Sequence, residues 1–155
     1  MMKSPITITS DDPRLEKINF KAYRNVIERE VKRFLPTANE PQTMVIATPL
    51  GDLTIKAGDY LVREVDSDKY WPVNQDIFRE TYKITRPGYC MKSSLTYLVP
   101  LVELTGGDPD QVVIVQSLEG PETVRAGDYH LARGIKGELY PFPNNKVGTV
   151  VKPAE

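Results

Sequence analysis

The chain contains the same four-residue stretch twice, Ala57-Gly58-Asp59-Tyr60 and Ala126-Gly127-Asp128-Tyr129. Each stretch follows an apolar run rich in β-branched residues, at residues 44–47 and 112–115, which is typical of a strand. The order of features around the stretch, more than its four letters, predicts an internal duplication, because repeated supersecondary units keep their elements in the same sequence.

Four further features recur in the same order around the two stretches. They are a turn glycine, a threonine followed by an aliphatic residue, an arginine, and an aromatic residue followed by proline: Gly51 and Gly120, Thr54-Ile55 and Thr123-Val124, Arg63 and Arg133, and Trp71-Pro72 and Tyr140-Pro141. One residue must be inserted near Arg133 to keep the copies in register. We therefore expect residues 44–73 and 112–141 to form the same β arrangement.

The repeated Gly-Asp pairs have a structural interpretation. Gly58 and Gly127 can adopt a positive φ at little cost, and the side chains of Asp59 and Asp128 can accept hydrogen bonds from nearby backbone amides. These properties predict that the four residues shape a turn.

The first copy is preceded by a segment with helical spacing. Residues 6–9 alternate in polarity and predict a strand. Apolar side chains then recur at helical intervals, which predicts a helix over residues 13–34 with Asp12 as its N-cap and Pro36 after its end. This segment has seven basic and three acidic residues. We interpret its charges as a solvated helix face, with an anion-binding surface as the alternative.

These elements together predict an α+β fold made of two similar, small β-rich units. The first unit, residues 1–85, would contain a strand, the helix, a β-hairpin and a further strand, ending in a capped helical turn at 76–82. The second unit, residues 86–155, is predicted to be a shorter, partial copy without a counterpart of residues 76–82. We expect the two units to pack around a pseudo-two-fold axis in one compact domain.

The motif residues resemble a known family. The second copy, from residue 117 through the Gly-Asp-Tyr stretch at 127–129 to Gly134 and Tyr140-Pro141, is similar to the PGDYG-type family of small uncharacterised phage and prophage proteins. Alanine stands at 57 and 126 where that family usually has proline. The resemblance implies a bacterial or phage setting and brings no catalytic assignment.

Composition excludes several classes of function. The net charge of the 155 residues is −1, so no overall electrostatic attraction to nucleic acid is indicated. The longest nearly apolar run, residues 97–104, is far shorter than the roughly 20 residues of a membrane helix. Cys90 is the only cysteine, which excludes an intrachain disulfide and fits the reducing cytoplasm of a bacterial host.

No catalytic or metal-binding set is visible in the sequence. His130 is the only histidine, and neither a phosphate loop nor a dinucleotide motif occurs. We interpret His130 as a residue on a solvated strand face and Cys90 as a small buried residue. The sequence thus favours a protein that binds without catalysis, and predicts no cofactor and no metal.

The repeated positions offer one candidate ligand site. If the units pair, Arg63 and Arg133 could line a shared groove with the aromatic residues Tyr70, Trp71 and Tyr140, a combination that suits a planar anion. Alternatively, the arginines pair with Asp59 and Asp128 while the aromatic rings pack in the core.

Three hypotheses for function follow. The first is a binding protein of phage origin that acts on a protein partner or a small ligand. The second is a nucleotide-binding or nucleotide-modifying protein, for example one used in counter-defence, and the third is a structural component of a phage particle. The sequence leaves a homo-oligomer open.

Overall fold

The computed structural model describes residues 4–48, 50–64 and 67–154. Strands hold 49% of the residues and helical elements 14%, with one α-helix in the described part of the chain. The strands are β1 (Ile6–Ile8), β2 (Lys21–Asn25), β3 (Arg29–Arg33), β4 (Thr43–Thr48), β5 (Gly51–Lys56), β6 (Tyr60–Arg63), β7 (Tyr70–Val73), β8 (Tyr82–Arg86), β9 (Tyr89–Lys92), β10 (Leu95–Pro100), β11 (Val112–Gln116), β12 (Pro121–Arg125), β13 (Tyr129–Arg133), β14 (Leu139–Pro143) and β15 (Val151–Pro153). The helical elements are the 3-10 turns η1 (Pro13–Lys17), η2 (Leu101–Glu103), η3 (Ala126–Asp128) and η4 (Asn144–Lys146), and the helix α1 (Gln75–Thr81).

The α+β prediction is wrong, because the segment 13–34 is not a helix. Asp12 does accept a hydrogen bond from the Arg14 amide at 2.9 Å, but the helical turn that it caps ends at Lys17. The rest of the segment forms β2 and β3. Each of these strands hydrogen-bonds to a strand on either side, so long-range backbone pairing outweighs the local helical spacing.

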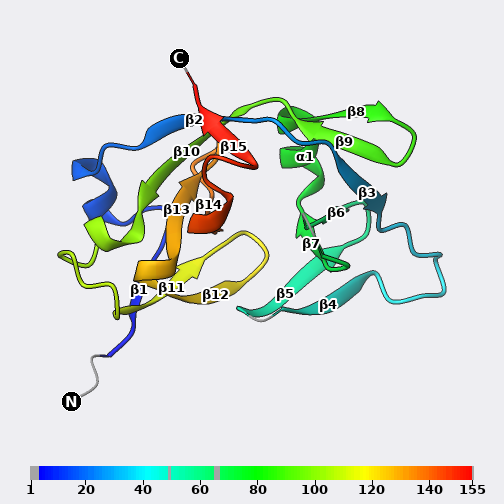
Figure 1. Cartoon of the computed structure of the whole chain (residues 1–155). Coiled ribbons are helices and arrows are strands. Elements are labelled where there is room, and N and C mark those ends of the chain that lie inside the picture. Colours follow the sequence, from blue (N-terminus) through cyan, green and yellow to red (C-terminus); the bar gives the residue numbers. More distant parts are fainter. Residues whose placement is uncertain (1–3, 49, 65–66, 155) are drawn as a thin grey trace.

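Two five-stranded sheets with the same strand order form the body of the molecule (Figure 1). One has the order β7-β6-β3-β9-β8 and the other β14-β13-β10-β2-β15. In each sheet, the chain runs from the third strand of this order through a hairpin to the second strand. The hairpin is β4–β5 in the first sheet and β11–β12 in the other. Residues 44–73 and 112–141 therefore share one β arrangement, as the sequence predicts.

Each half of the chain lends one strand to the sheet of the other half. β2 precedes β3 in the chain but pairs with β10, whereas β9 precedes β10 but pairs with β3. The pairing is equivalent on the two sides: Tyr23 lies opposite Thr96, and Cys90 lies opposite Arg29. Residues 1–85 and 86–155 consequently do not form separate sheets.

The second half is more complete than the sequence indicates. After β14, the turn η4 and strand β15 occupy the place that α1 and β8 occupy after β7, and β15 pairs with β2 as β8 pairs with β9. The prediction that the second copy lacks this element is thus wrong. The Asn74 side chain caps α1 by accepting from the amides of Asp76 and Ile77, whereas Pro143 offers η4 no side-chain cap. This difference explains why the second helical turn is short and hard to recognise.

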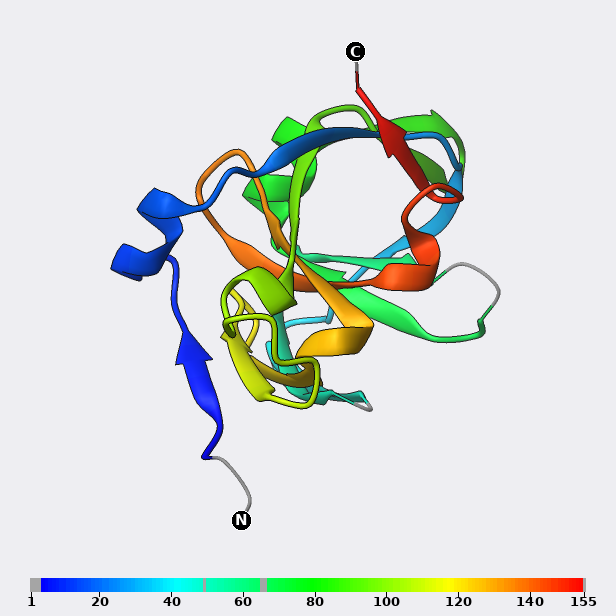
Figure 2. The ribbon, with the colours of Figure 1, turned by 60° about the vertical axis from the view of Figure 1, so that its left-hand side comes forward.

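The two hairpins are joined by a reciprocal pair of backbone hydrogen bonds. The Thr54 amide donates to the Glu119 carbonyl at 2.9 Å, and the Thr123 amide donates to the Leu50 carbonyl at 2.8 Å. Threonines at equivalent positions of the two copies therefore make equivalent bonds. Figure 2 shows the resulting arrangement from the side, with the strands curving around the middle of the molecule.

The hairpin turns have the same geometry. The Thr48 hydroxyl donates to the Gly51 carbonyl at 2.6 Å, and the Ser117 hydroxyl donates to the Gly120 carbonyl at 2.7 Å. The φ angles of Gly51 and Gly120 are 145° and 147°. Each glycine also lies close to the other hairpin. A Cβ added to Gly51, for example, would lie 2.6 Å from the carbonyl oxygen of Pro121.

Gly58 and Gly127 differ from each other. Gly58 has a φ of 94°, as predicted, but Gly127 lies in η3 without a positive φ, so this prediction is wrong for Gly127. Val62 lies opposite Trp71 and Ala132 opposite Tyr140, so the extra residue of the second copy falls in the turn ahead of β13. The longer turn accommodates Gly127 in a 3-10 conformation.

Buried apolar side chains form three separate clusters. One lies around β1, η1 and the β11–β12 hairpin and includes Ile8, Val113 and Leu131. The second includes Leu98 and Phe142, and the third includes Val62 and Phe78, on the two sheets respectively. Members of each cluster also line the space between the sheets, among them Leu139, Phe142 and Val73.

The close approach of the hairpins predicts a stability difference among glycines. We expect Gly51→Ala to reduce the free energy of unfolding by about 2 to 3 kcal/mol, since the new Cβ meets backbone and the φ is unfavourable. Gly137→Ala is the control, because Gly137 has a positive φ of 81° but open space around it, so its cost should be about 1 kcal/mol. Chemical denaturation measures both, and equal losses would contradict the role of the hairpin contact.

Candidate functional site

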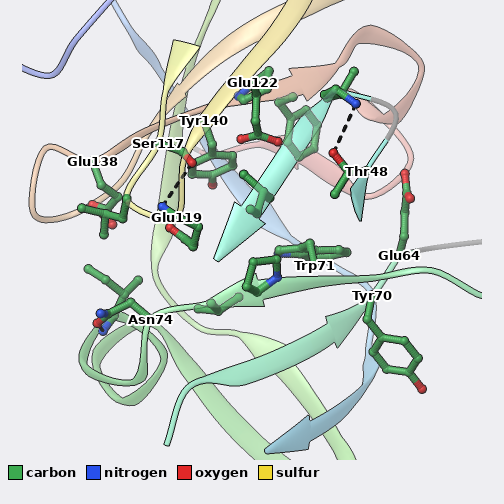
Figure 3. A pocket seen from close by; sticks show the side chains of 18 of the residues that line it. Thr48, Glu64, Tyr70, Trp71, Asn74, Ser117, Glu119, Glu122, Glu138 and Tyr140 are labelled. Atoms are coloured by element: carbon green, nitrogen blue, oxygen red, sulfur yellow. Dashed lines mark hydrogen bonds between the residues drawn. The ribbon is translucent and has the colours of Figure 1, made fainter. Parts of the chain in front are cut away.

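A cavity of about 290 Å³ lies between the two sheets, and we call it the central cavity (Figure 3). Both copies line it, and most lining residues come in pairs at equivalent positions: Thr48 and Ser117, Leu50 and Glu119, Leu53 and Glu122, Trp71 and Tyr140, Asn25 and Lys92, and Thr96 and Arg29. The backbone around the cavity is thus nearly symmetric, while its side chains are not.

At these equivalent positions, each exchanged strand and the strand it pairs with carry charge in the first sheet only. On the first sheet, Arg29 of β3 and Lys92 of β9 line the cavity. The equivalent residues of the second sheet are neutral: Thr96 and Asn25, whose amide donates to the Thr96 hydroxyl at 3.3 Å. Two cations therefore replace a neutral hydrogen-bonded pair.

Arg29 is a buried cation that has no acidic partner among the described residues. Only 8% of the residue is exposed, and its guanidinium lies 4.8 Å from the centre of the Trp71 ring. Its one protein hydrogen bond among the described residues is a 3.4 Å contact with the Arg63 carbonyl, and no described carboxylate lies within 4 Å. Burial lowers the pKa of Arg29, although arginine stays protonated in proteins.

Lys92, like Arg29, has no acidic partner among the described residues. Its ammonium donates to the Tyr140 hydroxyl at 2.7 Å and lies 5.1 Å from the centre of that ring, and within the described chain it forms no ion pair. Burial acts to lower the pKa of Lys92, but the nearby Tyr140 and Tyr82 oxygens outweigh burial, and the pKa is raised. Lys92 is therefore charged at neutral pH.

The hairpin of the second copy contributes two acids to the same cavity. Burial, with the neighbouring Glu122 charge, raises the pKa of Glu119 to about 8, and burial raises the pKa of Glu122 to about 7. Figure 3 shows both side chains at the cavity, together with Trp71 and Tyr140. Because much of the Glu119 population is protonated at neutral pH, its carboxyl can donate a hydrogen bond to a ligand.

The structure brings some of the sequence-predicted ligand residues to the cavity. Trp71 and Tyr140 line it from the two sheets. Tyr70 also borders it, but its ring points away, and its hydroxyl donates to Glu30 at 3.2 Å (Figure 3). The predicted groove is thus formed by two of the three aromatic residues.

Arg63 and Arg133 do not belong to the central cavity. Arg63 forms ion pairs with Glu30 at 3.0 Å and Asp68 at 3.3 Å, and the Arg133 guanidinium lies 4.0 Å from the centre of the Phe20 ring. The alternative, that they pair with Asp59 and Asp128, is also wrong.

The two repeated aspartates hold turns in different ways. Asp59 is buried and accepts from the amides of Lys56 at 3.0 Å and Gln75 at 2.9 Å, which ties the turn to α1. Asp128 is exposed and pairs with Arg125 at 3.1 Å. The structural interpretation fits Asp59 well, while Asp128 contributes only a surface ion pair.

The remaining candidate residues lie apart from the cavity. Cys90 is fully buried among apolar side chains, and burial raises its thiol pKa to about 11. The His130 Nδ1 lies 2.6 Å from the Asn144 amide oxygen on the outside of β13. Within residues 4–48, 50–64 and 67–154, no three His, Cys, Asp or Glu side chains gather into a metal site.

Sequence reasoning missed the charged residues of the cavity, among them Arg29, Lys92, Glu119 and Glu122. Arg29 was assigned to a helix, and Lys92 has asparagine at the matching position. Glu119 and Glu122 replace Leu50 and Leu53 of the first copy, so comparison of the copies position by position carries the signal that a site exists in one half.

Among known proteins, no family model, no curated protein and no solved structure matches the chain. The resemblance to the PGDYG-type family thus stays a prediction. Across the described residues, no helix is long and apolar enough to cross a bilayer.

The cavity acids predict a pH dependence of stability. In the unfolded chain glutamates ionise near pH 4.5, whereas folded Glu119 and Glu122 keep their protons until about pH 8 and pH 7. The unfolded state then binds fewer protons, so the free energy of unfolding should fall as the pH rises from about 5 to about 8. Thermal melts should show this fall for the wild type and a weaker one for Glu119→Gln. Glu16→Gln, on the exposed side of η1, is the control and should reproduce the wild-type curve.

Proposed function

We propose that the protein binds a small organic anion in the central cavity without converting it. The observation that carries this proposal is a pair of cations, the buried Arg29 and the half-buried Lys92, neither of which has an acidic partner among the described residues. An unpaired charge that is removed from water costs several kcal/mol of stability, so a chain that keeps two cations without a described acidic partner in one cavity is expected to use them.

The other lining residues suggest the shape of the ligand. Trp71 and Tyr140 offer aromatic faces to its apolar or planar part. Glu119 and Glu122, at the hairpin side, suit hydroxyl or amine groups at the other end. The volume lies at the small end of the roughly 300–1,000 Å³ typical of ligand pockets, which favours a molecule smaller than a nucleotide.

The setting of this function is part of the proposal. The shared strand order of the two halves supports an origin by internal duplication. The phage or prophage origin and the cytoplasm of a bacterial host rest on the resemblance noted in the sequence and on the single cysteine. Of the two kinds of partner in the binding-protein hypothesis, a protein or a small ligand, we favour the small ligand.

A thermal-shift screen against small carboxylates, phosphates, nucleotides and cyclic dinucleotides tests the proposal. At least one small anion should raise the melting temperature, and Arg29→Met or Lys92→Met should weaken its binding by about tenfold or more. Without ligand, both variants should melt at or above the wild-type temperature, because each removes an unpaired buried charge.

Arg133→Met is the matched control, since Arg133 lies outside the cavity and should leave binding unchanged. Loss of several degrees of melting temperature in ligand-free Arg29→Met and Lys92→Met would show that these cations are structural. A shift with nucleotides alone would favour the nucleotide hypothesis, and assembly into large particles would favour the structural one.

A further inference from the structure

The two hairpins differ in whether their outer edge pairs with a further strand. In the second copy, β1 covers the edge of β11 in parallel, with Ile6 opposite Val113 and Ile8 opposite Val115. In the first copy, β4 pairs with β5 alone among the described strands. Figure 1 shows β1 beside β11 at one end of the molecule, and β4 at the margin of the other.

Equivalent side chains show the effect of the missing strand. Met44 lies opposite Ile55 as Val113 lies opposite Val124, so Met44 corresponds to Val113. Val113 is fully buried, whereas 42% of Met44 and 63% of the adjacent Val45 are exposed. The first hairpin thus exposes apolar surface at a position that the second hairpin buries in a cluster to which β1 contributes Ile6 and Ile8.

The composition of β4 fits a strand that is covered. The run Met44-Val45-Ile46-Ala47 is apolar at successive positions, as is the covered run at 112–115. Such continuous apolar runs are typical of strands that are covered on both faces. Strand edges that remain open are usually protected by lysine, proline or a bulge, and Thr43–Thr48 contains no charged residue and no proline.

We infer that β4 binds an extended segment of a protein partner by strand addition. The geometry of β1 on β11 supplies the template: an uncharged segment, parallel to β4, with aliphatic side chains two residues apart. The partner's backbone would hydrogen-bond to the open edge of β4, and its aliphatic side chains would cover Met44 and its neighbours. This site is independent of the anion site in the central cavity.

The experiment uses a labelled peptide with the sequence of residues 4–10 of this chain, Ser-Pro-Ile-Thr-Ile-Thr-Ser, and the full-length protein. Fluorescence anisotropy should show saturable binding, which Val45→Lys should weaken by about tenfold or more, because the lysine places a charge on the edge strand. Ile84→Lys on β8 is the matched control, since Ile84 is 55% exposed outside the hairpin, and it should bind as the wild type does.

A second control varies the peptide instead of the protein. Replacing both of its isoleucines by aspartate should abolish binding, whatever the stability of the protein variants. The inference is overturned if no saturable binding occurs up to about 1 mM peptide. Equal binding by the wild type and Val45→Lys would also overturn it, since the peptide would then be displacing β1 from β11. A wild-type dimer that Val45→Lys converts to monomers would assign the edge to a second copy of the chain.

Discussion

The exchange of β2 and β9 between the two sheets is the constraint on which the rest of the structure depends. Each sheet is completed by a strand from the other half of the chain, so neither half can satisfy its backbone hydrogen bonds alone. The reciprocal bonds of Thr54 and Thr123 join the two hairpins to each other. Close packing there explains why glycine is needed at Gly51 and Gly120, where the backbones of the two hairpins meet.

This symmetry also creates the central cavity. Two sheets of equal order curve around a shared middle, and residues at equivalent positions of the two sheets line it. A small β structure usually fills such a space with apolar side chains. Here charged side chains, among them Arg29, Lys92, Glu119 and Glu122, line the middle together with apolar members of the three clusters such as Val73, Leu139 and Phe142. The burial of the charged groups opposes folding, and the clusters and the exchanged strands offset that cost.

The departures from symmetry are the positions at which a function can be argued. In the cavity, one copy supplies Leu50 and Leu53 where the other has glutamates, and one sheet supplies cations where the other has Thr96 and Asn25. At the hairpin edges, β1 covers β11 and leaves β4 without an equivalent partner. The two halves thus differ in the charge of the residues that line the cavity and in the pairing of their hairpin edges. The proposed ligand site and the proposed strand-addition site lie at these differences.

The sequence by itself determined the repeated β arrangement, the turn at Gly58-Asp59 and the presence of Trp71 and Tyr140 at one site, because these follow from local turn chemistry and from the order of the repeated features. Only the tertiary structure decided that residues 13–34 form strands, since β2 and β3 find their partners about 70 positions away. It also decided that Arg29 and Lys92 line a cavity while Arg63 and Arg133 lie outside it. Spacing along one strand carries no information about which sheet will receive that strand, and it is the exchange of β9 that brings Lys92 to the same sheet as Arg29.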